Sequence, residues 1–243
     1  DYERWIEKSR SASGVDIFAE ASTWPDDIRN DPRFYDEDRE LATPKLSGLS
    51  DTARHKRWHY VDLDAAGKTK SGELDAQIER LSRLLRSTGK KAEISYALPW
   101  LAHLVADIHQ PLHVGRHGDE GGNRVEIENP FTKRLPFSNL HVYWDDLPGP
   151  PWLRGKRLAQ NAARLLETHP APAQGNVALW RDESHDLLAE AYPDANGSLL
   201  PIISDDFRRR SRAIADRRIV EGGYRLGGLL EIIFGQRVPR ETP

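Results

Sequence analysis

The sequence predicts an all-α fold: a single, mainly helical domain over residues 1–243 that carries one small β-hairpin. Apolar residues recur at the helical period along most of the chain. Only one segment alternates polar and apolar residues as a half-buried strand does. No internal repeat, low-complexity tract or linker divides the 243 residues, and this length is sufficient to bury one large core.

The first clear helical patterns lie in the middle of the chain. In ELDAQIERLSRLLRS, the apolar stripe opposite the charged residues consists of Leu74, Ile78, Leu81 and Leu85. The next segment, AEISYALPWLAHLVADIH (92–109), is nearly apolar, so we expect it to form a central helix. Pro99 either kinks this helix or marks its first turn.

The strand pattern is RVEIE (124–128), where Val125 and Ile127 alternate with charged residues after the glycine-rich turn HGDEGGN. Helical periodicity then returns, and we expect helices over 155–169, 176–192 and 205–234. Two glycine pairs in the last of these segments, 222–223 and 227–228, predict close helix packing.

Composition excludes several classes of protein. A formal net charge of -3 provides no broad basic surface for gripping duplex DNA. The absence of Cys excludes disulfides, thiolate metal sites and cysteine nucleophiles. No apolar run approaches the roughly 18 residues of a membrane helix. Because the sequence contains no Met, not even an initiator, we expect a processed protein whose export signal has been removed, secreted or periplasmic. Separately, we expect a monomer.

The segment HLVADIHQPLH (103–113) gathers three imidazoles and one carboxylate. His103 and Asp107 are four residues apart and therefore share one face of a helix. Pro111 should end the helix near Gln110, and a bent chain can then return His113 towards Asp107. Converging imidazoles and carboxylates suit a divalent metal ion, above all zinc; ordinary histidines on a charged helix face are the alternative.

Four further residues that can bind metal lie beside bulky aromatic residues. Asp26 lies in STWPDDIR, His59 in RWHYVD, and NLHVYWDD offers His141 and Asp145 at helical spacing. Together with His103, Asp107 and His113 they make four imidazoles and three carboxylates, about enough for two zinc ions with open positions. A single such pair is more often a buried His bonded to a carboxylate, so the argument depends on the whole set.

These motifs resemble the zinc-dependent S1/P1 nuclease family. WPDDIR, WHYVD, HLVADIHQPLH, GDEGGN and NLHVYWD occur in the order and spacing of that family, and GGYRLGGLLEIIF is similar to its last helix. The resemblance implies an all-α enzyme of the zinc-dependent phospholipase C and P1 nuclease type. Such enzymes cut single-stranded DNA and RNA to 5'-phosphorylated products, and often also remove the phosphate from 3'-nucleotides.

The resemblance also implies roles for individual residues. The ligands of one zinc ion are matched by Asp26, His59, His103 and Asp107, and those of its neighbour by His113, His141 and Asp145. The catalytic positions are matched by Asp26 and by Arg29, the cation beside the scissile phosphate. The substrate-binding positions are matched by Tyr60 and Asp62, which hold a nucleobase, and by Asn123 in the glycine-rich loop.

The start of the chain departs from the family pattern. Family members begin with a Trp whose amino group binds metal, and a ligand His follows closely. Here Trp5 is internal and the first His is His55. Either an upstream metal-binding segment is missing from this sequence or the third zinc site is lost, so we expect two of the family's three zinc ions.

Two alternatives remain open. A zinc-dependent phospholipase C uses a similar His-x3-Asp-x5-His arrangement, but that family places Glu where this chain has Asp145. The other alternative is an inactive, helical metal-binding protein. Structural zinc sites usually close with four protein ligands, whereas the second predicted site here has three.

Overall fold

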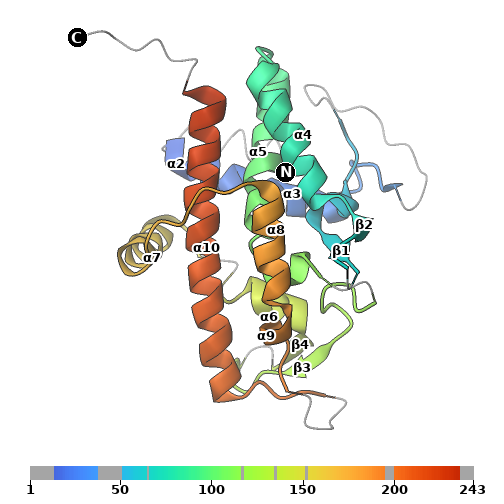
Figure 1. The fold of residues 1–243 in the computed structure, drawn as a ribbon, viewed down its shortest axis with the longest axis vertical. Coiled ribbons are helices and arrows are strands. Elements are labelled where there is room, and N and C mark those ends of the chain that lie inside the picture. The colour runs from blue at the N-terminus through green and yellow to red at the C-terminus, as the bar shows by residue number, and fades with distance from the viewer. Residues whose placement is uncertain are drawn as a thin grey trace.

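The computed structural model describes residues 14–37, 51–64, 66–115, 118–133, 136–150, 153–194 and 200–235. Most of these residues lie in helices, which confirms the predicted fold class (Figure 1). The helices are α2 (Gly14–Ala21), α3 (Trp24–Asp27), η1 (Ile28–Asn30), η3 (Lys56–His59), α4 (Leu74–Ser87), α5 (Lys91–Asp107), η4 (Pro111–His113), α6 (Leu140–Asp145), α7 (Gly155–Thr168), α8 (Val177–Asp186), α9 (Leu188–Ala191) and α10 (Asp205–Phe234). The strands are β1 (Val61–Leu63), β2 (Thr69–Gly72), β3 (Glu126–Glu128) and β4 (Phe137–Asn139).

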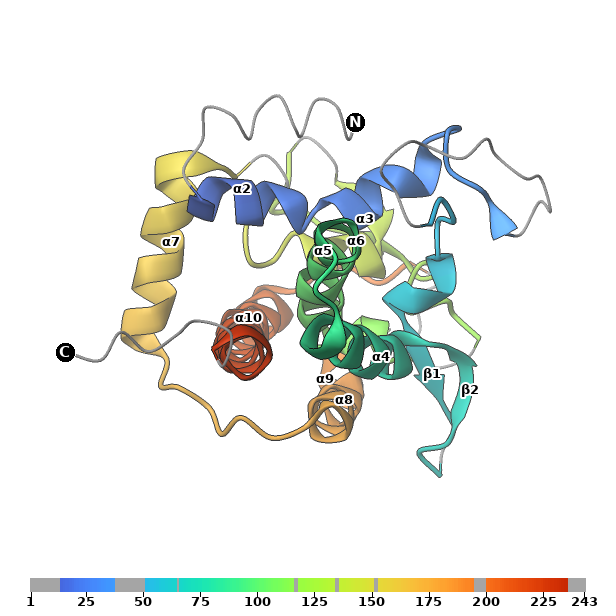
Figure 2. The same ribbon diagram turned by 90° about the horizontal axis from the view of Figure 1, so that it is seen from above.

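Helix α5 is the buried centre of the fold, as the sequence predicts. It packs against α4 and α10, and in the view from above it lies among α3, α4 and α10 (Figure 2). Trp100, Leu101 and Leu104 are fully buried. Pro99 lies inside the helix rather than in its first turn. The predicted apolar stripe of α4 is fully buried against this centre.

The long helix α10 runs along the whole molecule (Figure 1). One glycine of each predicted pair makes the close contact. A Cβ on Gly222 would lie 3.3 Å from the His109 ring, and one on Gly228 would clash with the Gln174 side chain. Gly223 and Gly227 face open space. These contacts let α10 approach the end of α5 and the loop before α8.

The predicted helix over 176–192 is divided into α8 and α9. The break lies at Leu187, whose N–H bonds to the Ser184 carbonyl three residues back instead of four. This tighter turn ends α8, and α9 begins at the next residue. The other predicted helices agree with α4, α5, α7 and α10 within a few residues.

The prediction of one small hairpin is incomplete, because the described residues contain two. β3 pairs with β4 antiparallel, and it occupies the last three residues of the predicted strand. β1 pairs with β2 antiparallel, with Val61 opposite Gly72. All three β1 side chains are buried, so the segment lacks the alternation that marks a half-buried strand, and β2 consists of polar residues and glycine.

No helix of the described residues is long and apolar enough to cross a membrane. Trp5 and the departure from the family pattern lie within residues 1–13, outside the described residues.

Candidate functional site

The opening motif folds as the spacing predicts. His103 and Asp107 occupy successive turns at the end of α5, which finishes at Asp107. Gln110 begins the short helix η4, and its side-chain oxygen accepts a hydrogen bond from the Leu112 N–H at 2.5 Å. His113 ends η4, and its Nδ1 lies 3.8 Å from the Asp107 carboxylate. The bend after α5 thus returns His113 towards Asp107.

The first ligand group consists of Asp26, His59 and His103, with one ligand atom from each lying within 4.8 Å of the others. His59 Nδ1 lies 3.1 Å from His103 Nε2. The Asp26 Oδ1 atom lies 3.7 Å from each of these nitrogens. Three elements far apart in sequence meet here, namely α3, η3 and α5.

The second ligand group consists of His113, His141 and Asp145, again with ligand atoms within 4.8 Å of one another. His113 Nε2 lies 3.7 Å from Asp145 Oδ1, and His141 Nε2 lies 3.5 Å from Asp145 Oδ2. His141 and Asp145 are one turn apart on α6, as their spacing predicts. The side chain of Gln110 donates to Asp145 Oδ1 at 2.9 Å.

Asp107 lies between the two groups. Its Oδ2 atom is 3.2 Å from His103 Nε2, 3.3 Å from His59 Nδ1 and 3.8 Å from His113 Nδ1. This oxygen is buried and forms no hydrogen bond with any described residue. A buried carboxylate oxygen without such a partner is costly unless positive charge compensates it. The seven residues therefore fit a bound metal, because a cation among these imidazoles satisfies that oxygen.

Backbone carbonyls orient three of the four imidazoles. His103 Nδ1 donates to the Ser22 carbonyl at 2.9 Å, and His141 Nδ1 donates to the Gly121 carbonyl at 2.8 Å. His113 Nδ1 donates to the His59 carbonyl at 2.5 Å. In each ring the Nε2 lone pair is then left facing its ligand group. This is the usual arrangement for metal-binding histidines, whose second nitrogen donates to a carbonyl or carboxylate.

The electrostatics of the site favour bound positive charge. Burial alone disfavours charge on His103 and His113, but nearby carboxylates, chiefly Asp107, outweigh it and raise the pKa of each imidazole to about 9. Burial likewise opposes charge on Asp107, yet the neighbouring imidazoles hold the pKa of that carboxyl well below its usual range. The site therefore holds an ionised carboxylate and attracts either protons or a metal ion, which compete for the same nitrogens.

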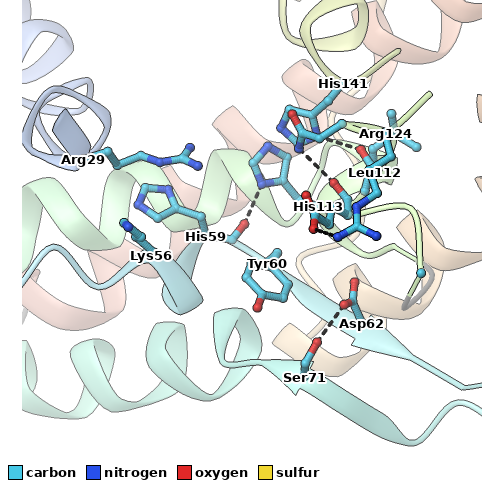
Figure 3. Close-up of a pocket in the computed structure, with 14 residues that line it drawn as sticks. Arg29, Lys56, His59, Tyr60, Asp62, Ser71, Leu112, His113, Arg124 and His141 are labelled. Carbon is cyan, nitrogen blue, oxygen red and sulfur yellow. Dashed lines mark hydrogen bonds and ion pairs between the residues drawn. The ribbon is translucent and has the colours of Figure 1, made fainter. Parts of the chain in front are cut away.

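Two adjoining cavities, of about 450 and 770 Å³, form a cleft beside the ligand groups, and Figure 3 shows the smaller one. The smaller cavity, here named the aromatic lobe, is lined by Tyr60 and by Asp62 and Ser71 of the first hairpin. Asp62 is buried, and its Oδ2 accepts a hydrogen bond from Ser71 Oγ at 2.7 Å. The adjoining metal lobe is lined by Asp26, Asp107 and Asp145. An aromatic ring and a fixed carboxylate thus lie beside the predicted metal ligands.

Three cations line the aromatic lobe, namely Arg29, Lys56 and Arg124, and Arg54 also lines the metal lobe. Arg29 forms an ion pair with Asp26 at 3.5 Å, so it lies at the first ligand group as predicted. Lys56 is not identified by the sequence motifs; it precedes His59 by three residues and contacts buried Asp36. Each of the three cations of the aromatic lobe is paired with a carboxylate that also lines the cleft: Arg29 with Asp26, Lys56 with Asp36 and Arg124 with Glu120.

The glycine-rich turn supports the second ligand group. Gly121 and Gly122 have positive φ values of 60° and 81°, and the Gly121 carbonyl is the partner of His141. Asp119 anchors the turn by accepting hydrogen bonds from the Gly122 N–H and the Tyr192 hydroxyl. Asn123 lines both lobes of the cleft, and its side-chain amide donates to the Glu120 carbonyl at 2.8 Å.

His109 does not contribute to the metal lobe. It is buried against α10, where Nδ1 donates to the Val105 carbonyl and Nε2 accepts from Arg225 at 3.0 Å. Burial, with the nearby arginines, lowers its pKa to about 3. His109 therefore serves packing, although it lies inside the metal-binding motif.

Comparison with known proteins agrees with this geometry. The sequence profile of the S1/P1 nuclease family matches residues 3–235. The chain belongs to the S1/P1 nuclease family. This family consists of hydrolases that act on phosphodiester bonds.

Individual members of the S1/P1 family are similar in sequence to this chain over 59% to 87% of its length. Endonuclease 1 of Arabidopsis thaliana is 28% identical over 236 residues, 87% of this chain and 73% of that protein. Endonuclease 4 of the same plant is 30% identical over 161 residues, which cover 59% of this chain and 52% of that protein. Nuclease S1 of Aspergillus oryzae is 25% identical over 183 residues, 65% of this chain and 61% of the relative. The alignment with Endonuclease 4 thus spans only about half of that relative's length.

Proposed function

We propose that this chain is a zinc-dependent endonuclease that hydrolyses single-stranded DNA and RNA to 5'-phosphorylated products, and that it also removes the phosphate from 3'-nucleotides. The observation that carries the proposal is the buried Asp107 oxygen, which lacks a hydrogen bond among the described residues and lies between two groups of metal-capable side chains. The chain's membership of the S1/P1 family indicates the class of reaction, hydrolysis of phosphodiester bonds. We further propose export and a monomeric state.

Zinc suits the donor set better than calcium or magnesium. Four imidazoles dominate it, and imidazole nitrogen is a common zinc ligand, whereas the alkaline-earth ions prefer oxygen ligands. Each ligand group leaves room for further ligands beyond the protein. Zinc, when bound, lowers the pKa of its water to near neutral pH and offsets the negative charge of a phosphate.

The residues of the chain position the substrate. Arg29 neutralises charge on the scissile phosphate beside Asp26. Tyr60 stacks against a nucleobase, and the Asp62 carboxylate accepts a hydrogen bond from the base edge while Ser71 fixes its direction. Asn123 lines the cleft next to both lobes and contacts the bound nucleotide. A paired base cannot present its face to Tyr60, so the site prefers single strands.

The family match favours this function over a phospholipase C. The test compares hydrolysis of single-stranded DNA, duplex DNA and phosphatidylcholine by the zinc-loaded protein. We expect single-stranded DNA to be the preferred substrate. Preference for phosphatidylcholine, or absence of cleavage with zinc present, would refute the proposal.

Two variants separate metal binding from base binding. Asp107→Asn keeps the shape of the side chain but removes its charge, so zinc content by elemental analysis and cleavage should both be lost. Tyr60→Ala should keep its zinc while catalytic efficiency falls about ten- to hundredfold, the value of one stacked base. Full zinc occupancy in Asp107→Asn would refute the ligand assignment.

A further inference from the structure

Arg124 is a cation at the edge of the aromatic lobe, directly after the glycine-rich turn. It lines only this lobe, as Tyr60 and Asp62 do. Arg29 and Lys56, in contrast, line both lobes. In the view of Figure 3 the Arg124 guanidinium and the Asp62 carboxylate lie on the same side of the Tyr60 ring. Arg124 is therefore placed beside a base stacked on Tyr60 and not in the lobe that holds the scissile phosphate.

One ion pair anchors the Arg124 side chain and leaves most of its donors unused. Nη2 donates to Glu120 Oε1 at 2.5 Å. A guanidinium has five N–H donors in a rigid plane, and the other four here form no hydrogen bond with any described residue. The side chain is 66% exposed. Its remaining donors are thus available to a ligand in the lobe.

The turn holds both members of this pair in place. Glu120 has φ +55°, a left-handed conformation that residues other than glycine rarely adopt. Its carbonyl accepts from the Asn123 side chain at 2.8 Å, and the Arg124 N–H donates to the Asp119 carbonyl at 3.1 Å. Strained backbone outside glycine gathers at ligand sites. Glu120 also lines the aromatic lobe, so the strained turn directs the ion pair to the position of the base.

The aromatic lobe thus offers a base three kinds of contact: the Tyr60 ring, the Asp62 carboxylate and the Arg124 donors. Guanine carries two neighbouring acceptors, O6 and N7, and two neighbouring donors, N1–H and N2–H. A bidentate arginine contact to O6 and N7 is the commonest specific contact that proteins make with guanine. Adenine replaces O6 by an amino group, which opposes an arginine donor. Each pyrimidine has only one donor group for the carboxylate.

We propose that Arg124 donates two parallel hydrogen bonds to O6 and N7 of a guanine stacked on Tyr60, so that the aromatic lobe favours guanine over the other bases. This inference rests on the proposed function, because it needs a base in the lobe. It identifies the substrate class as single strands that contain guanine.

The experiment measures binding of the zinc-loaded protein to cleavage-resistant phosphorothioate trinucleotides that carry one variable base between two thymines. The variable base is guanine, adenine, cytosine, thymine or 7-deazaguanine, in which carbon replaces N7. Arg124→Gln removes the guanidinium. The matched control is Arg83→Gln, because Arg83 is also paired with a glutamate four residues earlier and is 69% exposed, but does not line the cleft.

The wild type should bind the guanine trinucleotide about tenfold more tightly than those with adenine, cytosine or thymine, a value within the range for one bidentate contact. Replacing guanine with 7-deazaguanine should weaken binding about fivefold, as expected for one lost hydrogen bond. Arg124→Gln should bind guanine and 7-deazaguanine equally, and its preference for guanine should fall to about twofold or less. Its affinity for the thymine trinucleotide should stay within about twofold of the wild type, and Arg83→Gln should match the wild type throughout.

Three results would overturn the inference. Equal wild-type affinity for all bases, or for guanine and 7-deazaguanine, would exclude the contact to O6 and N7. An unchanged guanine preference in Arg124→Gln would assign that preference to other residues. An equal loss for every base, with a weaker dependence of binding on salt, would place Arg124 on a backbone phosphate.

The same measurements separate this inference from the proposed function. A wild type that prefers guanine in binding but does not cleave unmodified single-stranded DNA would refute the proposed function alone. A wild type that cleaves single strands but binds all bases alike would refute the role of Arg124 alone.

Discussion

Gln110 links the two halves of the second ligand group. Its side-chain nitrogen donates to Asp145 Oδ1 at 2.9 Å, while its side-chain oxygen accepts from the Leu112 N–H. One amide thus joins the turn that carries His113 to helix α6, which carries Asp145. A hydrogen bond of this kind fixes the direction of a ligand carboxylate without contact to the metal.

Replacing Gln110 with Ala should therefore weaken zinc binding at the second ligand group by about 10- to 100-fold, the usual cost of losing such a partner. A titration against a zinc chelator measures the effect. Gln77→Ala is the matched control, since the Gln77 amide also donates to a carboxylate at 2.9 Å, that of Glu73, on remote α4. Equal zinc affinity in the two variants would show that Asp145 does not need this support.

For single residues, the sequence identifies candidate metal ligands more readily than the residues that hold those ligands in place. The pairs His103–Asp107 and His141–Asp145 can be found by their helical spacing, and the other candidate ligands stand out only as members of the whole set. Gln110 carries no such pattern, since its role depends on which distant side chain the fold places beside it. The carbonyls that orient His103 and His141 belong to Ser22 and Gly121, and a backbone carbonyl has no signature in the sequence.

Among the elements, the β1–β2 hairpin forms one wall of the aromatic lobe. Gly72 in β2 has φ +79°, and a Cβ there would clash with the Tyr60 carbonyl oxygen. That carbonyl accepts hydrogen bonds from the N–H groups of Glu73 and Leu74, which begin helix α4. The close approach at Gly72 therefore fixes Tyr60 between the hairpin and the start of a core helix.

Gly72→Ala should be destabilising by about 3 kcal/mol or more, because the strained φ costs about 1–2 kcal/mol and the Cβ also meets backbone atoms. Gly67→Ala is the control: its φ is +75°, but a Cβ there has no atom within 4 Å. Gly67→Ala should therefore lower the free energy of unfolding by only about 1–2 kcal/mol. Urea denaturation of both variants measures the difference, and similar losses would mean that the backbone relaxes around the added methyl group without penalty.

The helices were predictable and this hairpin was not, for a physical reason. Leu74 to Leu85 repeats at the helical period because only one face of α4 is buried. β1 is buried on both faces, and three residues are too few to show any period. Its pairing with β2 follows from long-range packing.

Across the whole molecule, an ionic network with two buried arginines joins α10, α8 and the end of α5. Arg218 and Arg225 of α10 both bond to Glu183 of α8. Arg218 also donates to the His109 carbonyl, and Ser184 donates to the Ile108 carbonyl. The two carbonyls that follow α5 directly after Asp107 are therefore satisfied by two other helices, which fixes the end of α5 at the metal lobe.

Glu183 makes this network sensitive to acid. Burial opposes its charge, but the hydrogen bonds from Arg225 and Arg218 outweigh burial and lower its pKa from 4.5 to about 2. A lowered carboxyl pKa contributes stability that is fully present above the unfolded-state value of 4.5 and is lost as the pH falls towards 2. The network should thus stabilise the fold near neutral pH and weaken over that acidic interval.

Glu183→Gln should lower the free energy of unfolding by about 2 kcal/mol at about pH 7, a value reduced from the full pKa shift because a third of the side chain is exposed. At about pH 3 the difference from the wild type should narrow to about half or less, since protonation then removes the same charge in the wild type. Urea denaturation of the metal-free proteins measures both values, so that zinc release in acid does not contribute. Glu79→Gln, which removes an exposed partner of Arg83, should change stability by less than about 0.5 kcal/mol at either pH. An equal loss in Glu183→Gln at both pH values would mean that the carboxylate charge is not what joins these helices.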